Sequence, residues 1–95
     1  MSYSISQVAV NAAVATTTAT TILFSASTNV FGRSVYNAST SACYVTYGTV
    51  ASSTVFTNQV AANAFYAFPV PTYQGQISVI WVNSDASGTA HTTQW

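Results

Sequence analysis

Few residues in this 95-residue chain could do acid–base or nucleophilic chemistry. The chain has one histidine, His91, and one carboxylate, Asp85, beside its serines. A Ser–His–Asp triad would need one of these serines in a suitable turn, but no serine lies in a Gly-x-Ser-x-Gly sequence. His91 alternates with Thr89 and Thr93, which is typical of a strand face. We therefore expect a surface or interface histidine and no enzyme.

Cys43 is the remaining candidate nucleophile. It lies in the sequence Cys43-Tyr44-Val45 with no neighbouring cation to lower its pKa, which favours a small buried hydrophobic residue. A single cysteine cannot form an internal disulfide, and only the distant His91 could share a metal ion with it. We expect no metal site and no cofactor.

The charge content excludes several classes of partner. Only 2% of the residues are charged, namely Arg33 and Asp85, whereas about 25% is usual in soluble domains. One cation cannot neutralise a series of phosphates, so nucleic acid and anionic membranes are excluded as electrostatic partners. The longest apolar run, residues 64–70, is too short to span a membrane. Six Tyr, five Phe and two Trp argue against disorder.

The elements that position these residues are predicted to be strands. The chain has no Glu, no Lys and one Leu, whereas Val, Thr, Tyr and Phe are abundant. Small polar clusters recur about every ten residues between the β-rich runs. We predict an all-β fold: a single small β-sandwich or jelly-roll-like domain, residues 1–95, of seven to eight short antiparallel strands. The predicted strands are near residues 2–10, 17–24, 33–37, 43–47, 54–58, 64–68, 76–82 and 89–94, with residues 1–15 as a candidate N-terminal arm or added strand.

Two segments are open to more than one interpretation. Residues 77–82 are apolar at nearly every position, which indicates a strand covered on both faces by the core and by either a partner subunit or a neighbouring loop. Asn37-Ala38-Ser39 matches the N-glycosylation pattern, but a turn in which Asn and Ser bond the backbone explains it without a sugar.

Arg33 and the aromatic residues are the candidates for subunit contacts. Arg33 could be a solvated charge at a strand edge, or a forked donor to backbone carbonyls or to Asp85 across an interface. Aromatic residues contribute strongly to cores and interfaces, and exposed tyrosines could also form a carbohydrate platform. The candidate interface residues are Arg33, Tyr36, Tyr44, Tyr66, Tyr73 and Trp81.

The order of residues from Arg33 to Ala90 resembles that of small structural proteins of tailed bacteriophages. The landmarks are spaced turn and core residues with no catalytic signature among them. They are Arg33, Tyr36-Asn37-Ala38-Ser39, Tyr44-Val45, Gly48, Ala51-Ser52, Tyr66, Phe68-Pro69, Tyr73-Gln74-Gly75, the segment from Ile77 to Trp81, and Gly88-Thr89-Ala90.

The resemblance implies a capsid cement or head-decoration protein. Such a protein is a β-sandwich, expected as a homotrimer, that binds the major capsid protein on the outside of the head and stabilises its joints. Its location would be the virion, assembled in the cytoplasm of the host bacterium. The alternative is a tail, fibre or baseplate adaptor that binds host glycans. A fibre-forming protein of silk type is a third hypothesis, against which the absence of a sequence repeat argues.

Overall fold

The computed structural model describes residues 9–28 and 30–95, which form eight strands and no helix. None of these residues belongs to a helix long and apolar enough to cross a bilayer. The strands are β1 (Val10–Ala15), β2 (Thr21–Phe24), β3 (Arg33–Ala38), β4 (Cys43–Tyr47), β5 (Asn58–Val60), β6 (Phe65–Ala67), β7 (Ile77–Trp81) and β8 (Thr89–Gln94).

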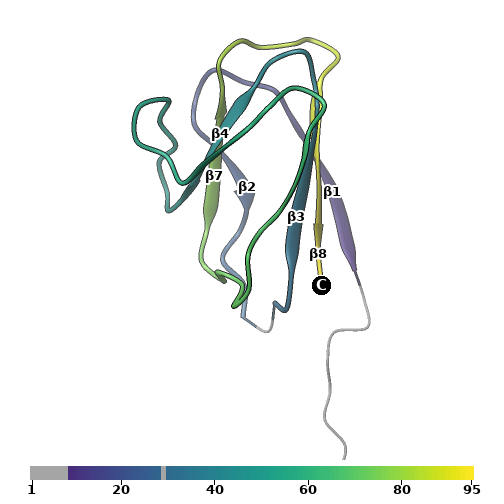
Figure 1. The fold of residues 1–95 in the computed structure, drawn as a ribbon, viewed down its shortest axis with the longest axis vertical. Coiled ribbons are helices and arrows are strands. Elements are labelled where there is room, and N and C mark those ends of the chain that lie inside the picture. The colour runs from purple at the N-terminus through teal and green to yellow at the C-terminus, as the bar shows by residue number, and fades with distance from the viewer. Residues whose placement is uncertain (1–8, 29) are drawn as a thin grey trace, which may run out of the picture.

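The strands form two four-stranded antiparallel sheets that pack face to face (Figure 1). Sheet A has the order β1-β8-β3-β6 and sheet B the order β2-β7-β4-β5. Strand β1 pairs with β8, β2 with β7, β3 with β6 and β4 with β5. This is the pairing of one long antiparallel ribbon rolled into two layers, which is the jelly-roll arrangement. The predicted fold class is confirmed.

The core lies between the two sheets because the inward positions of the central strands are β-branched or aromatic. Val35 of β3 faces Val45 of β4 and Val79 of β7 from the opposite layer, and all three are fully buried. Phe24 and Phe68 meet edge to face with ring centroids 5.7 Å apart. The apolar surface that these side chains bury stabilises the sandwich.

Five of the predicted strands agree with the structure to within one or two residues at each end. They are those near residues 33–37, 43–47, 64–68, 76–82 and 89–94. Runs of β-branched and aromatic residues between small polar clusters were the correct signal there.

Two predicted strands are displaced. The strand predicted at 54–58 is wrong: β5 begins only at Asn58, because the Ser52 hydroxyl accepts hydrogen bonds from the backbone N–H groups of Thr54 and Val55 and folds that segment into a turn. Similarly, the predicted strand 17–24 begins at Thr21, since the Thr17 hydroxyl accepts a hydrogen bond from the backbone N–H of Ala19.

Most of the strand predicted at 2–10, and of the candidate arm at 1–15, lies outside the described residues. The structure places β1 at Val10–Ala15, a segment rich in alanine that received no strand of its own in the sequence prediction. It is a strand because six consecutive residues pair with β8 in unbroken register.

Candidate interaction surface

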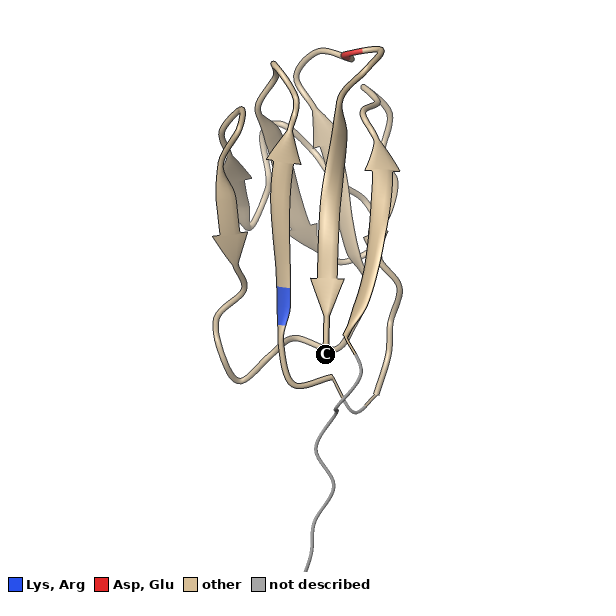
Figure 2. Ribbon diagram, turned by 90° about the vertical axis from the view of Figure 1, so that its right-hand side faces the viewer, with Lys and Arg blue, Asp and Glu red and all other residues tan. Residues whose placement is uncertain are grey.

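The residues with titratable or nucleophilic side chains are dispersed over the fold. Arg33 and Asp85 lie at opposite ends of the sandwich (Figure 2). The Asp85 carboxylate accepts hydrogen bonds from the backbone N–H and hydroxyl groups of Thr40 and Ser87, and the bonds from the two N–H groups are the main reason that its pKa is lowered. His91 lies on β8, where its Nε2 is 3.1 Å from the Thr89 hydroxyl. The histidine and the carboxylate therefore do not form a triad.

Cys43 is buried in the core, as the sequence predicted. Burial raises the pKa of its thiol to about 12, so the reactive thiolate is disfavoured. Among the described residues, no group of three or more His, Cys, Asp and Glu side chains could hold a metal ion.

Arg33 is an interior residue that joins the two sheets at the end of the sandwich opposite to Asp85. Its side chain is 1% exposed and lies over the ring of Phe24, with the guanidinium carbon 5.1 Å from the ring centroid. Nη1 donates to the carbonyl oxygens of Tyr73 and Gly75, both at 2.7 Å, and Nη2 donates to that of Ser25 at 2.8 Å. Burial lowers the pKa of the guanidinium, and these oxygens take the place of water around its charge.

The interpretation of Arg33 as a solvated edge charge is therefore wrong. Its Nε also donates to Oε1 of Gln94, so the guanidinium bonds acceptors of its own chain, and Asp85 is not one of them. Because the side chain is fully enclosed by its own chain, the prediction that Arg33 contacts another subunit is corrected.

Trp81 is likewise an interior residue, and it belongs to a polar cluster around Asn37. The Trp81 Nε1–H donates to Oδ1 of Asn37 at 3.1 Å, and the Ser39 hydroxyl donates to the same oxygen at 2.7 Å. The Asn37 amide nitrogen donates to the carbonyls of Ser41 and Val60. Trp81 is 2% exposed, so the prediction that it contacts another subunit is corrected. Asn37 is fully buried, and the backbone hydrogen bonds of Asn37 and Ser39 agree with the explanation of the glycosylation pattern without a sugar.

The four candidate tyrosines differ in how much surface they offer. Tyr44 lies against Phe56, with ring centroids 4.6 Å apart, and Tyr66 meets Phe68 at 4.8 Å. Tyr73 stacks on Tyr47 at 4.4 Å with the rings parallel. These three are half-buried in contacts within the chain, whereas Tyr36 is exposed on β3.

The outer face of sheet B is covered in part by its own chain, at Ser78, whereas Ile22 on the same face stays 49% exposed. After β4 the backbone turns at Gly48, whose φ of 145° is a conformation that favours glycine, and the loop of residues 48–57 extends beyond β4 on the left of Figure 1. Its Gly48 carbonyl accepts a hydrogen bond from the Ser78 hydroxyl near the start of β7, and its Ala51 N–H donates to the Thr20 hydroxyl just before β2. A neighbouring loop thus covers the second face of β7 at Ser78, which is one of the two predicted alternatives.

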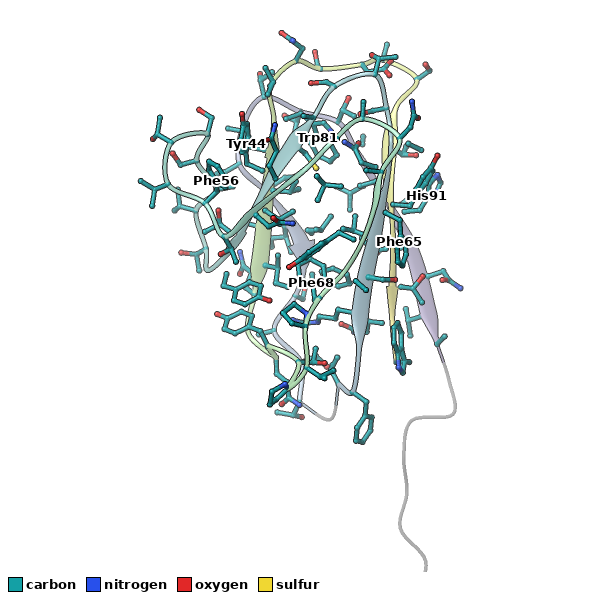
Figure 3. All side chains as sticks on the ribbon, in the orientation of Figure 1. Tyr44, Phe56, Phe65, Phe68, Trp81 and His91 are labelled. Carbon is teal, nitrogen blue, oxygen red and sulfur yellow. The ribbon has the colours of Figure 1, made fainter. Side chains whose placement is uncertain are left out.

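The outer face of sheet A carries no such loop within the part of the chain that the structure describes, and it faces the viewer in Figure 2. The register of the four strands places Ala13, His91, Tyr36 and Phe65 side by side across it, and we call these four residues the aromatic row. Phe65 is 65% exposed, and His91 and Phe65 both lie on the outward side of the sheet in Figure 3. The Tyr36 and His91 rings are stacked, with their centroids 6.4 Å apart.

The residues beside the aromatic row are small and uncharged. Asn11, Thr93, Ser34 and Ala67 form the adjacent row across the same four strands. The Thr93 hydroxyl donates to Oδ1 of Asn11 at 2.7 Å, so neighbouring polar groups partly satisfy one another. This neutral face with exposed aromatic rings is the strongest candidate interaction surface.

Sequence reasoning missed Phe65, whereas it expected His91 at the surface or in an interface, and His91 is exposed on β8. The alternation of Phe65 with Tyr66 shows that the two point to opposite sides of a strand, but it does not show which side is the core. Only the pairing of β6 with β3 places Phe65 beside Tyr36.

A groove opens between the edge strands β1 and β2. It holds about 220 Å³ and is lined on one sheet by Val10, Ala12, Thr92 and Gln94, and on the other by Leu23, Phe24 and Ser25. Val10 is 57% exposed although it lies on the side of β1 that faces sheet B. The core is therefore open to the outside at this corner of the sandwich.

No protein-family model, curated protein or solved structure matches this chain.

Proposed function

We propose that the chain is a non-enzymatic structural protein of a bacteriophage virion, a capsid cement or decoration protein. It binds the outside of the head through the outer face of sheet A and stabilises contacts between copies of the major capsid protein. The partners are the major capsid protein and further copies of the chain, proposed as a homotrimer. The virion setting comes from the sequence resemblance, and the mode of action comes from the surface described above.

The observation that carries the proposal is the contrast between the two sheet faces. Sheet B covers part of its outer face with its own loop and leaves Ile22 exposed there, whereas the outer face of sheet A exposes the paired aromatic rings of Tyr36 and Phe65. The centres of protein–protein interfaces are enriched in aromatic residues and depleted of charge, and the aromatic row has both properties. An uncharged surface also avoids the cost of desolvating ions on docking.

The fold is compatible with this role without specifying it. Jelly rolls occur in viral capsid proteins and also in lectins, so function has to be argued from the surface and not from the topology. The dispersed positions of His91, Asp85 and Cys43 support a binding role over a catalytic one.

The location of the chain in the virion tests the proposal. Virions that contain the chain would be purified and reconstructed by cryo-electron microscopy. We expect density for the sandwich on the outer surface of the head, at joints between capsid subunits, with sheet A turned toward the shell. Density confined to the tail, or virions without the chain, would overturn the cement assignment.

A glycan-binding tail or baseplate adaptor is the second candidate. It is favoured by the hydroxyl and amide groups of Thr89, Thr93 and Asn11, which lie beside exposed aromatic rings and could bond sugar hydroxyls. A glycan array probed with the purified protein distinguishes the two, because specific binding that is lost in Tyr36→Ala supports the adaptor and a blank array opposes it.

A further inference from the structure

The four edges of the two sheets are not equally protected against pairing with another strand. Edge strands are normally kept short, bulged, charged or flanked by proline, because a regular edge presents unpaired backbone groups. Strands β5 and β6 have three residues each, and β6 is followed by Pro69 and Pro71. The register of β2 shifts between Ile22 and Phe24. Each of these three edges therefore has a recognisable protection.

Strand β1 has none of these protections. Its six residues pair with β8 in continuous register and contain no charge and no proline. Within the described residues, no strand pairs with its other side. A strand added there would be the fifth strand of sheet A, and its inward side chains would extend over the groove between β1 and β2.

The groove beside β1 has the size and chemistry to receive such side chains. Its volume of about 220 Å³ compares with the roughly 150 Å³ cavities that admit a benzene ring, so it accommodates one or two large side chains. Leu23 and Phe24 belong to the hydrophobic core and Val10 extends their apolar surface outward. The groove thus favours a neutral strand with apolar residues on one face.

The chain itself contains a segment with these properties. In Ser2-Tyr3-Ser4-Ile5-Ser6, apolar residues alternate with serine, with no charge and no proline. Such alternation suits a strand with one face buried and one face solvated. At about 3.3 Å per residue, the eight residues before Ala9 span about 26 Å when extended, which is long enough to lie along all of β1.

The sequence that joins the segment to β1 does not favour pairing with its own β1. To lie antiparallel along the strand that follows it, the chain would have to reverse tightly near residues 6–9. Hairpin turns favour Gly, Asn or Asp, and Ser6-Gln7-Val8-Ala9 has none of these. Without such a reversal the segment cannot pair with its own β1, and the β1 edge of a second copy is the remaining partner of this kind.

From these observations we infer that the β1 edge and its groove bind the N-terminal segment, residues 2–7, of a second copy of this chain. Tyr3 and Ile5 occupy the groove, and the backbone adds a strand to sheet A. The inference rests on the proposed function in one respect, the association of copies, and it names the contact that joins them. It is separate from the docking of the aromatic row on a shell.

Matched substitutions in the full-length protein test this contact. Ile5→Asp places a charge on the apolar side of the segment, and Ser4→Asp places the same charge on its solvated side. Ala12→Glu blocks the groove, whereas Ala15→Glu adds a charge to the other side of β1, where Ala15 is exposed. Circular dichroism melts confirm that each variant is folded.

Sedimentation velocity over a range of concentrations provides the readout. We expect wild type, Ser4→Asp and Ala15→Glu to form the same discrete oligomer. Ile5→Asp and Ala12→Glu should each associate about tenfold or more weakly, because a charge would be buried in an apolar site. If these two variants associate as wild type does, or if wild type is monomeric, the inference is overturned.

Mixing the two defective variants gives a second test that a loss of stability cannot imitate. Ile5→Asp retains an intact groove and Ala12→Glu retains an intact segment. If segments are exchanged between copies, the mixture forms heterodimers with one segment bound, at concentrations where each variant alone is monomeric. A mixture that stays monomeric shows that the segment does not bind between copies. Tyr36→Ala, which alters only the aromatic row, should leave the oligomer unchanged, so failure of shell docking is distinguishable from failure of this contact.

Discussion

At the scale of single residues, the only cation of the chain has a structural role. Arg33 holds together segments that are distant in sequence, since Tyr73 and Gln94 lie 40 and 61 residues after it. A buried guanidinium is stable when its donors are satisfied, and here three carbonyl groups and one amide oxygen accept from four of its five N–H groups. The packing of the two sheets at this end of the sandwich therefore depends on the Arg33 side chain.

We expect Arg33→Lys to lower the free energy of unfolding by about 2–3 kcal/mol. Lysine keeps the charge but cannot reach four acceptors in a forked geometry, which leaves buried carbonyls without donors. Urea denaturation checks the value. Asn83→Ala, a substitution at an exposed position on the opposite end, serves as the control and should change it by less than about 0.5 kcal/mol. An Arg33→Lys variant as stable as wild type would contradict the structural role.

The Cys43 thiol gives a prediction for alkaline pH. Its pKa is raised to about 12 from an ordinary value of 9.0, so the folded protein keeps the proton that the unfolded chain releases between these values. The contribution of the thiol to the free energy of unfolding is fully present below pH 9. It falls by about 1.4 kcal/mol per pH unit as the pH rises toward 12. Urea denaturation of wild type and Cys43→Ala across this range measures the difference. Equal slopes for the two proteins would contradict the assigned burial.

At the scale of the elements, the outer face of sheet A should be functional and dispensable for folding. Tyr36→Ser combined with Phe65→Ser should change the free energy of unfolding by less than about 1 kcal/mol, because both side chains are exposed. The same double variant should lose most of its binding to heads in co-sedimentation. Val55→Ser, in the loop that covers sheet B, is the matched control and should bind normally. If the double variant binds as wild type does, the aromatic row is not the docking surface.

Some of the strands could be predicted from the sequence and others could not. Strands such as β7 could be predicted because a strand with buried Ile77, Val79 and Trp81 leaves a clear apolar pattern. Strand β5 could not, since three residues, Asn58–Val60, are too few for a pattern and their pairing with β4 decides their conformation. The alanine-rich β1 is likewise a strand because of its neighbour β8.

The candidate surface was predictable only in part, for the same reason. The number of aromatic residues indicated an interface, but which of them are exposed depends on pairing across the sheets. Tyr36 and Trp81 were equal candidates in the sequence, yet one is 39% exposed and the other is buried against Asn37. Long-range contacts of this kind leave no local signal.

At the scale of the whole molecule, the absence of net charge predicts how association responds to salt. With one Arg that is buried and one Asp at the far end, docking gains little from Coulomb attraction. Binding to heads should change by less than about twofold between low and physiological ionic strength, and it should strengthen in sulfate, which favours apolar burial. Co-sedimentation at several salt concentrations measures this. A steep loss of binding with sodium chloride would indicate an electrostatic contact instead.

On the virion, the aromatic row should be buried against the capsid. Hydroxyl-radical footprinting of the free protein and of the protein on purified virions, read by mass spectrometry, tests it most directly. We predict strong protection of Tyr36, Phe65 and His91 on the virion, with Phe56 on the opposite side of the sandwich labelled as in the free protein. Equal labelling of Phe65 in both states, or protection of Phe56 alone, would contradict the account.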